Sequence, residues 1–185
     1  MDDCALKETI VSRELIFPGH VIRVEQWQVK LPDGGIAPRE IVLHRGASAV
    51  VALDEENRMI LVRQHRVAVD RVTLEIPAGK LDTADEDPLL CAKRELEEET
   101  GLRADQWSKL FVLETTPGFC NERIHLYMAS GLHEGHSHPD EDEFVATQRI
   151  PLSEALQMVM RGELHDGKTA LGILMAAQQQ HLSSI

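Results

Sequence analysis

The sequence predicts an α/β fold in which a mixed β-sheet has helices on both faces. The prediction rests on a series of short strand patterns, on turn residues between pairs of them, and on several helical patterns. The turn residues Asp33-Gly34-Gly35 and Asp54-Glu55-Glu56-Asn57 separate pairs of strands. We expect the strands at residues 20–31, 41–44, 48–53, 59–64, 72–76, 110–114, 124–129 and 143–150.

The central helix has well marked ends. Asp87 suits the N-cap, Pro88 suits the first helical position, and Gly101 suits the left-handed residue just past the C-terminus. Two further helices are expected at about residues 152–161 and 166–180. On the central helix, the residues of the arc that faces the core are Leu89, Ala92 and Leu96.

Glu95, Glu98 and Glu99 lie on the neighbouring arc of the central helix. Glu95 and Glu99 form a like-charge pair one turn apart, which costs about 0.2 to 0.5 kcal/mol. Glu98 and Glu99 also lie at the negative end of the helix dipole. A divalent cation would remove both penalties, because clustered carboxylate oxygens are the ligands that Mg²⁺ and Mn²⁺ prefer. The alternative is an acidic helix face exposed to solvent.

The composition agrees with a compact soluble enzyme, and the cysteines favour a reducing cytoplasm. One domain is the default at 185 residues, which are enough for a full core. The N-terminus is acidic and no apolar run approaches about 18 residues, so neither a signal peptide nor a membrane span is expected. The cysteines form no Cys-x-x-Cys pair, and their odd number gives no disulfide framework. The net charge of −12 argues against nucleic-acid binding through a basic surface.

The run Arg94-Glu95-Leu96-x-Glu98-Glu99-x-Gly101-Leu102 resembles the second half of the Nudix box. This box is the signature of hydrolases that cleave nucleoside diphosphates linked to another moiety. In the family pattern five residues separate the leading glycine from the first glutamate, whereas six separate Gly79 from Glu86. Glu86 keeps the usual gap of seven residues to Arg94. We interpret the difference as a one-residue insertion in the loop before the helix, which leaves the role of Glu86 open.

Further segments are similar to the ADP-ribose pyrophosphatase branch of this family. They lie at residues 44–47, 61–66, 75–81, 117–122 and 140–144, and the similarity runs from about residue 10 to 180. In that branch a proline lies about sixteen residues past the last glycine of the box, and Pro117 lies sixteen past Gly101. Some sugar-nucleotide hydrolases share this marker. The resemblance places Pro117 and Gly118 among the substrate-binding residues.

The resemblance implies a Mg²⁺-dependent enzyme, with Mn²⁺ as the alternative ion, that hydrolyses ADP-ribose to AMP and ribose 5-phosphate. It also implies an α/β/α sandwich with a further antiparallel sheet near the N-terminus. On this basis residues 1–45 form a β-rich segment that joins two copies in a homodimer, and residues 46–185 form the hydrolase domain. The alternatives are hydrolysis of ADP-glucose, GDP-mannose or a dinucleotide such as NADH, and a non-catalytic module that senses nucleotides.

The box carboxylates are the expected metal ligands. We expect Glu95 and Glu99 to bind the ion, with Glu98 as a further ligand and catalytic residue. The resemblance adds the backbone carbonyl of Ala78. Gly79 would let the backbone approach the ion, or it is a turn glycine before a loop.

Arg94 cannot bind a cation, so its expected role is to orient a box glutamate through a charge-assisted hydrogen bond. The alternative is a surface arginine that balances nearby acids. Similar enzymes take a catalytic glutamate and a further metal ligand from a Glu-x-Glu loop, which matches Glu141 and Glu143. We expect Glu141 to be the general base and Glu143 the ligand, although their roles are exchangeable and an acidic loop is also a common solvated tether.

Substrate recognition is expected from Arg39, Arg66 and Trp27. The two arginines match family positions that contact the nucleotide sugar, and the guanidinium fork suits phosphate oxygens. Similar enzymes stack adenine on an aromatic residue in the region of Trp27, but a tryptophan packed in a sheet is also common. The histidines of segment 133–138 lack the cysteine spacing of a zinc site, so a mobile polar loop is expected there.

Overall fold

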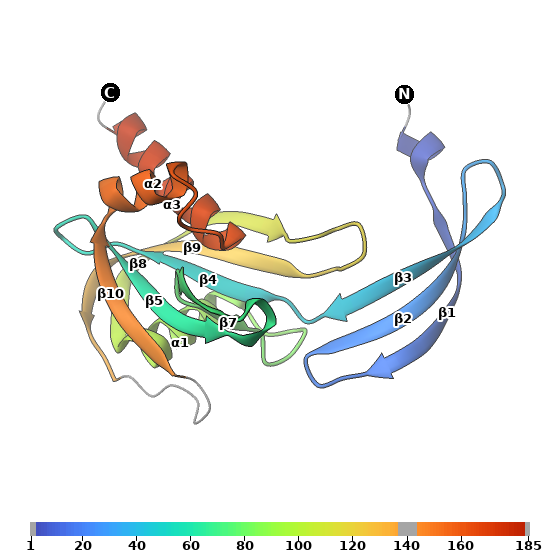
Figure 1. Cartoon of the computed structure of the whole chain (residues 1–185), viewed down its shortest axis with the longest axis horizontal. Helices are drawn as coiled ribbons and strands as arrows, with labels where there is room; N and C mark the ends of the chain where they lie inside the picture. Colours follow the sequence, from blue (N-terminus) through green and yellow to red (C-terminus); the bar gives the residue numbers. More distant parts are fainter. Residues whose placement is uncertain (1–2, 137–143, 184–185) are drawn as a thin grey trace. The chain divides into compact units, whose positions relative to one another are not determined.

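The computed structural model describes residues 3–136 and 144–183, and the chain divides into two compact units (Figure 1). The first unit comprises Met1–Gly46 and Glu114–Arg123. The second unit comprises Ala47–Leu113 and Ile124–Ile185, and it contains the helix that carries the box glutamates.

The first unit contains an antiparallel sheet with the strand order β1-β2-β3. The predicted turn joins β2 to β3, where the backbone N–H of Gly35 donates to Asp33 Oδ1 at 2.9 Å. Gly34 has a φ of 91°, a conformation that favours glycine. In chain order the elements are the short 3-10 helix η1 (Asp3–Leu6), β1 (Thr9–Pro18), β2 (Ile22–Lys30) and β3 (Ile36–His44).

Segment 114–123 pairs with β3, an arrangement that the sequence did not indicate. The N–H of Val42 donates to the carbonyl of Phe119 at 2.7 Å, and the N–H of Asn121 donates to the carbonyl of Val42 at 3.2 Å. The N–H of His44 donates to the side-chain oxygen of Asn121 at 2.7 Å. This distant segment belongs to the first unit because its backbone groups find their hydrogen-bond partners there.

The second unit contains two sheets and the three α-helices. The sheet β7-β4-β9-β8 is mixed, since β4 runs parallel to β9 and antiparallel to β7. The sheet β10-β5-β6 is antiparallel. The elements are β4 (Ala47–Ala52), β5 (Arg58–Arg66), the 3-10 helix η2 (Val67–Val69), β6 (Arg71–Glu75), β7 (Ala78–Lys80), α1 (Pro88–Thr100), β8 (Leu102–Glu114), β9 (Arg123–Glu134), β10 (Val145–Pro151), α2 (Leu152–Met160) and α3 (Gly167–Ser183).

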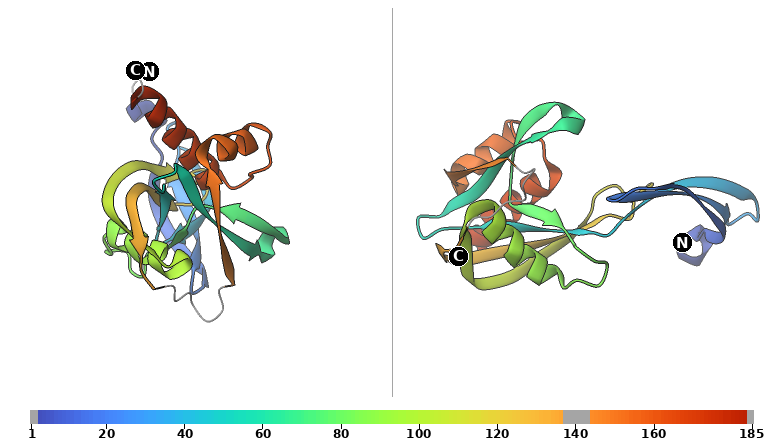
Figure 2. Two further views of the ribbon diagram at one scale, coloured as in Figure 1. Left: turned by 90° about the vertical axis from the view of Figure 1, so that its left-hand side faces the viewer. Right: turned by 90° about the horizontal axis from the view of Figure 1, so that it is seen from below.

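Strand β4 lies at the centre of the core because it is buried on both faces. One face of β4, with Val51, packs in a cluster that includes Ile173 of α3. The opposite face, with Val50, packs in a second cluster that includes Ala92 and Leu96 of α1. Figures 1 and 2 show α1 on one side of the mixed sheet and α2 and α3 on the other. This arrangement confirms the predicted α/β/α sandwich, and the β1-β2-β3 sheet confirms the further antiparallel sheet.

The predicted helix ends are confirmed for α1. The side chain of Asp87 accepts a hydrogen bond from the N–H of Leu89 at 2.9 Å, and Pro88 is the first helical residue. Gly101 ends the helix with a φ of 70°. Helices α2 and α3 lie close to their expected positions. Among the helices of the described residues, none has both the length and the apolar character needed to cross a lipid bilayer.

Several strands differ from the prediction. Strands β1 and β7 were not predicted, β8 begins at Leu102 rather than at residue 110, and β9 continues to Glu134. The early part of β8 has few β-branched residues, so its strand structure follows from pairing in the sheet rather than from local propensity. The apolar residues of β1 stand next to each other, as in Ile10-Val11 and residues 15–17, so no alternation revealed this strand.

Candidate functional site

The acidic face of α1 is partly buried in the second unit. Glu95 is 7% exposed and Glu99 is 4% exposed, although both are carboxylates of the same sign one helical turn apart. They are buried because the neighbouring residues Ala92 and Leu96 pack α1 against the mixed sheet. Burial of like charges is unfavourable unless cations or hydrogen bonds compensate it. The groups that compensate the charges of Glu95 and Glu99 therefore define the site.

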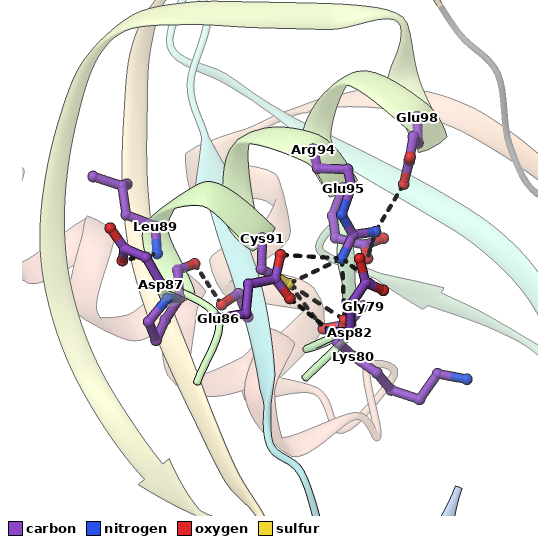
Figure 3. A network of polar contacts seen from close by, with 12 residues as sticks. Gly79, Lys80, Asp82, Glu86, Asp87, Leu89, Cys91, Arg94, Glu95 and Glu98 are labelled. Carbon is purple, nitrogen blue, oxygen red and sulfur yellow. Dashed lines mark hydrogen bonds and ion pairs between the residues drawn. The ribbon is translucent and has the colours of Figure 1, made fainter. Parts of the chain in front are cut away.

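Arg94 lies beside the acidic face of α1 and forms hydrogen bonds with Glu95 and Glu98 (Figure 3). Its Nη1 donates to Glu95 Oε1 at 2.7 Å and to Glu98 Oε2 at 3.1 Å. Its Nη2 donates to the carbonyl of Lys80 at 3.2 Å. Burial disfavours the charge of Arg94, but the attraction of Glu95 and the other acids outweighs it, so the pKa of Arg94 is raised. The structure therefore brings Arg94 to the box glutamates that the sequence suggested it would orient.

The loop before α1 joins the same network. Glu86 Oε2 accepts a hydrogen bond from the N–H of Asp82 at 2.6 Å. The carboxylates of Glu86 and Asp82 each lie 3.7 Å from Arg94 Nη2. Glu86, whose role was open, thus lies at the edge of the cluster and holds the loop against the arginine, as Figure 3 shows.

Strand β7 supplies its backbone to the acidic face. The N–H of Ala78 donates to Glu99 Oε2 at 3.1 Å. A Cβ atom placed on Gly79 would lie 2.0 Å from the carboxyl carbon of Glu95, a distance at which one of the two groups must move. Gly79 is therefore required for the close approach of Glu95 to the backbone, and it lies in a strand rather than in a turn.

Cys91 is the buried thiol beside this cluster, and no sequence motif assigns it a catalytic role. Its Sγ lies 3.5 Å from the carbonyl oxygen of Lys80 and 3.7 Å from that of Gly79. Burial, with the repulsion of Glu95, raises the pKa of Cys91 to about 11. The thiol stays protonated at neutral pH, so it is not a nucleophile of the thiolate type.

The chemistry of the cluster fits a divalent metal ion. Carboxylates outnumber cations around Arg94, and the buried oxygens of Glu95 and Glu99 lie against the main chain of β7. Hard divalent cations prefer such oxygen donors. Within residues 3–136 and 144–183, no three His, Cys, Asp or Glu side chains already surround a single point as metal ligands would. In the structure Arg94 provides the positive charge instead.

Arg66 lies at the end of β5 in the same unit. Its Nε and Nη2 donate to the two carboxylate oxygens of Glu75 at 2.8 and 2.9 Å. The hydrogen bonds that Arg66 donates to Glu75 raise the pKa of Arg66, and Glu99 adds to the effect through its charge. Arg66 is thus within electrostatic reach of the acidic face of α1. Sequence reasoning missed Glu75, although an acid at the end of the apolar run 72–76 was a visible signal.

The other predicted recognition residues belong to the first unit. Trp27 and Arg39 face each other across β2 and β3. Trp27 is partly buried, its Nε1 donates to Glu25 Oε2 at 2.8 Å, and the guanidinium carbon of Arg13 lies 4.5 Å from the centre of a Trp27 ring. Arg39 forms an ion pair with Glu8. Pro117 and Gly118 lie exposed in segment 114–123.

Two predicted features fall partly or wholly outside the described residues. Glu141 and Glu143, the expected base and further ligand, lie in segment 137–143, which is not described. The expected polar loop at 133–138 needs a correction, because His133 and Glu134 are the last residues of β9. These two residues extend the strand instead of starting a loop, since β9 pairs within the mixed sheet.

Comparison with known proteins identifies the relatives of this chain. The family description "NUDIX domain" matches residues 42–170. The methanol dehydrogenase activator of Bacillus methanolicus is 42% identical over 178 residues, which cover 95% of this chain and 96% of that protein. The ADP-ribose pyrophosphatase of Bacillus subtilis (strain 168) is 43% identical over 171 residues, with coverage of 91% and 92%. A crystal structure of an ADP compounds hydrolase superposes with a TM-score of 0.82 at 21% identity, covering 96% of both chains, and this likeness concerns the fold.

Proposed function

The chain belongs to the Nudix family, and on this premise we propose that it hydrolyses ADP-ribose to AMP and ribose 5-phosphate with the help of Mg²⁺. The observation that carries the proposal is the buried pair Glu95 and Glu99, which lies against the backbone of Ala78 and Gly79. The substrate is inferred from the relative that bears the name of this activity and is 43% identical over 171 residues.

The acidic face of α1 would hold the ion. Glu95, Glu98 and Glu99, with the carbonyl of Ala78, offer the oxygen donors that Mg²⁺ prefers, and Mn²⁺ shares that preference. When bound, a divalent cation neutralises charge on the pyrophosphate and activates the attacking water. Both Glu95 and Glu99 are buried, and the backbone of Ala78 and Gly79 lies against them.

Arg94 would orient the carboxylates for metal binding. One of its nitrogens binds both Glu95 and Glu98, and the other is fixed to the backbone of Lys80. Charge-assisted bonds of this kind hold the carboxylates in a defined orientation. A ligand whose position is already defined loses less freedom when the reacting groups assemble.

Arg66 would bind a phosphate of the substrate. Glu75 occupies its Nε and Nη2, and among the described residues no hydrogen bond engages its Nη1. Its side chain is 40% exposed, so an anion can reach it. Arg39, Trp27, Pro117 and Gly118 are proposed as further substrate contacts on the strength of the family resemblance, as are Glu141 as the general base and Glu143 as a further ligand.

A homodimer through residues 1–45 is part of the proposal, with residues 46–185 as the hydrolase domain. Strand β1 is exposed along its whole length, and its exposed apolar residues include Ile10, Leu15, Ile16 and Phe17. An apolar edge strand is prone to pair with another chain, so we propose that a second copy of this chain covers the apolar residues of β1. Light scattering tests this assignment, and a monomer would contradict it. The free cysteines Cys4, Cys91 and Cys120 support the proposed cytoplasmic location.

A second candidate function is the activation of a methanol dehydrogenase, which is favoured by the 42% identity to a protein of that name over nearly the whole chain. The two functions are compatible, because an activator can act through hydrolysis of a nucleotide. The test is the rate of a purified methanol dehydrogenase with and without this protein. An inactive Glu99→Gln variant shows whether hydrolysis is needed, and an unchanged rate with the wild type would rule this function out.

The proposed hydrolysis is tested with a panel of ADP-ribose, ADP-glucose, GDP-mannose and NADH. Each is incubated with Mg²⁺, with Mn²⁺, and with EDTA, and the products are separated by chromatography. We expect metal-dependent release of AMP from ADP-ribose at the highest kcat/KM. Tight binding of ADP-ribose without any turnover would instead identify a nucleotide-sensing module.

A further inference from the structure

A second cluster of charges lies where strands β5 and β6 meet the start of α3. Its centre is Glu75, the last residue of β6, which is 3% exposed. Arg66, the last residue of β5, and Lys168, near the start of α3, both contact this one carboxylate. The ends of three elements that are distant in sequence are therefore joined at a single buried group.

Both oxygens of Glu75 are fully used within the described residues. Arg66 Nε binds Oε1 at 2.8 Å and Arg66 Nη2 binds Oε2 at 2.9 Å, which is the two-bond geometry of an arginine and a carboxylate. The hydroxyl of Thr73 donates to Oε1 at 2.6 Å. Lys168 Nζ donates to Oε2. Glu75 thus has a single orientation that satisfies all its donors, and Arg66 takes its own orientation from Glu75.

Lys168 is itself held in place. Its side chain is 11% exposed, and its Nζ lies 3.0 Å from Asp166 Oδ2. Asp166 Oδ2 also accepts a hydrogen bond from the N–H of Thr169 at 3.0 Å, and the hydroxyl of Thr169 accepts one from the N–H of Ile76 at 2.9 Å. A continuous set of hydrogen bonds runs from the backbone after β6, through the start of α3, and back to Glu75.

The electrostatics agree with the geometry. Burial opposes the charge of Glu75, but Arg66 and Lys168 outweigh it and lower the pKa of Glu75 to about 2. Without Lys168, the carboxylate would keep Arg66 as its only cation and would lose a donor on Oε2. A buried carboxylate with an unmet partner tends to shift or to gain access to water. Arg66 would then lose the fixed partner that sets the orientation of its side chain.

We infer that Lys168 is a positioning residue for substrate binding, because it fixes Glu75, and Glu75 in turn directs Arg66 toward a phosphate group of the nucleotide. The inference rests on the proposed function, since Arg66 needs an anionic ligand to bind. In this proposal Lys168 acts through its contact with Glu75 and not by binding the substrate itself. The effect of Lys168 on the substrate therefore passes through Arg66.

The test is a double-mutant cycle with the nucleotide that the wild type hydrolyses best. The variants are Lys168→Met, Arg66→Gln and the double variant, with Lys168→Arg as the conservative replacement. Lys109→Met is the matched control, because Lys109 is an exposed lysine of β8 in the same unit. The readouts are kcat, KM, and the Kd of the nucleotide measured by calorimetry in EDTA. Urea unfolding curves verify that each variant folds.

We expect Lys168→Met to raise KM and Kd about tenfold and to change kcat less than about threefold, because an anion contact is weakened and the reacting groups remain. Lys168→Arg should recover most of the affinity, and Lys109→Met should leave all constants unchanged. On the Arg66→Gln background, Lys168→Met should raise Kd less than about twofold, since the residue through which it acts is gone.

Three outcomes would overturn the inference while the wild type remains active. One is a tenfold effect of Lys168→Met that persists on the Arg66→Gln background, which would mean that Lys168 acts independently of Arg66. Another is an unchanged Kd in Lys168→Met. The third is a fall in kcat at constant KM, which would assign Lys168 to the chemical step. A wild type that neither hydrolyses nor binds any nucleotide of the panel would overturn the proposed function itself, and the inference with it.

Discussion

Glu95 and Glu98 on α1 share the guanidinium of Arg94, whereas Glu75 on β6 is contacted by two cations, Arg66 and Lys168. Both regions bury carboxylates in the same unit, and the difference lies in the balance of charge. Around Glu75 the charges are matched and every oxygen has donors, as in a structural ion-pair network. On α1 the acids are in excess, which costs stability unless a further cation binds. We therefore propose that the excess of acids on α1 marks the site of chemistry and that the balanced cluster around Glu75 supports it.

The largest effect is expected from Glu99→Gln. The change removes a buried carboxylate from the face with excess negative charge, so metal-stimulated kcat should fall by at least about two orders of magnitude. Loss of groups that merely support metal ligands already costs about 10- to 100-fold. The free energy of unfolding without metal should stay equal or rise, because a like-charge pair is removed. Steady-state kinetics and urea unfolding measure both quantities, and an unchanged kcat would remove α1 from the mechanism.

Gly79→Ala tests whether the backbone of β7 must approach Glu95. The new Cβ would lie 2.0 Å from the Glu95 carboxyl carbon, so the carboxylate must move. Misplacement by about 1 Å costs on the order of 100-fold in rate, and we expect a loss of that size in kcat. Gly167→Ala is the matched control for folding in the same unit, because its Cβ would meet no atom within 4 Å. Circular dichroism should show both variants folded, and a fully active Gly79→Ala would contradict the role given to this glycine.

Acid unfolding measures how much the balanced ion pairs of Glu75 contribute to stability. The pKa of Glu75 is lowered from 4.5 to about 2, so its ion pairs contribute fully above about pH 4.5 and are lost as the pH falls through about 2. At about 1.4 kcal/mol for each unit of pKa, the contribution is about 3 kcal/mol. Glu75→Gln should therefore be less stable than the wild type at pH 7, and the difference should shrink toward pH 2. Urea unfolding at several pH values measures it. A difference independent of pH would mean that Glu75 acts by packing and not by charge.

The smallest effect is expected from Asp87→Ala at the start of α1. The side chain of Asp87 caps the helix through the N–H of Leu89, and loss of such a cap costs about 1 kcal/mol. The acidic face lies two turns further on, so KM and kcat should stay within about twofold of the wild type. A large loss of activity at unchanged stability would show that the cap also positions the site.

The sequence predicted the parts of the fold that carry local signals. The cap at Asp87, the glycine at the end of α1 and the apolar run of β4 each follow from one segment of chain, and each is found in the structure. Strands β1, β7 and the early part of β8 were missed because their pairing depends on partners elsewhere in the fold. Segment 114–123 was read as following a strand, whereas its backbone pairs with β3.

In the site too, the sequence predicted local contacts and missed those between distant segments. The glutamates of α1 and Arg94 lie within one helix, so their spacing alone brought them together. Gly79 was expected either to let the backbone approach an ion or to be a turn glycine, and only the structure shows that Glu95 lies against it. The cluster of Glu75 and Lys168 joins residues 93 positions apart, and no local pattern indicates such a contact.

The most direct test of the account is a titration of Mn²⁺ into the wild type, Glu95→Gln and Glu97→Gln, followed by electron paramagnetic resonance of the free ion. Glu97 is the matched control, because it lies on the same helix and pairs with Arg103 at 2.7 Å. We predict that the wild type and Glu97→Gln bind Mn²⁺ equally and that Glu95→Gln binds it at least about tenfold more weakly. Equal binding by all three proteins would contradict the proposal that the buried carboxylates of α1 hold the metal.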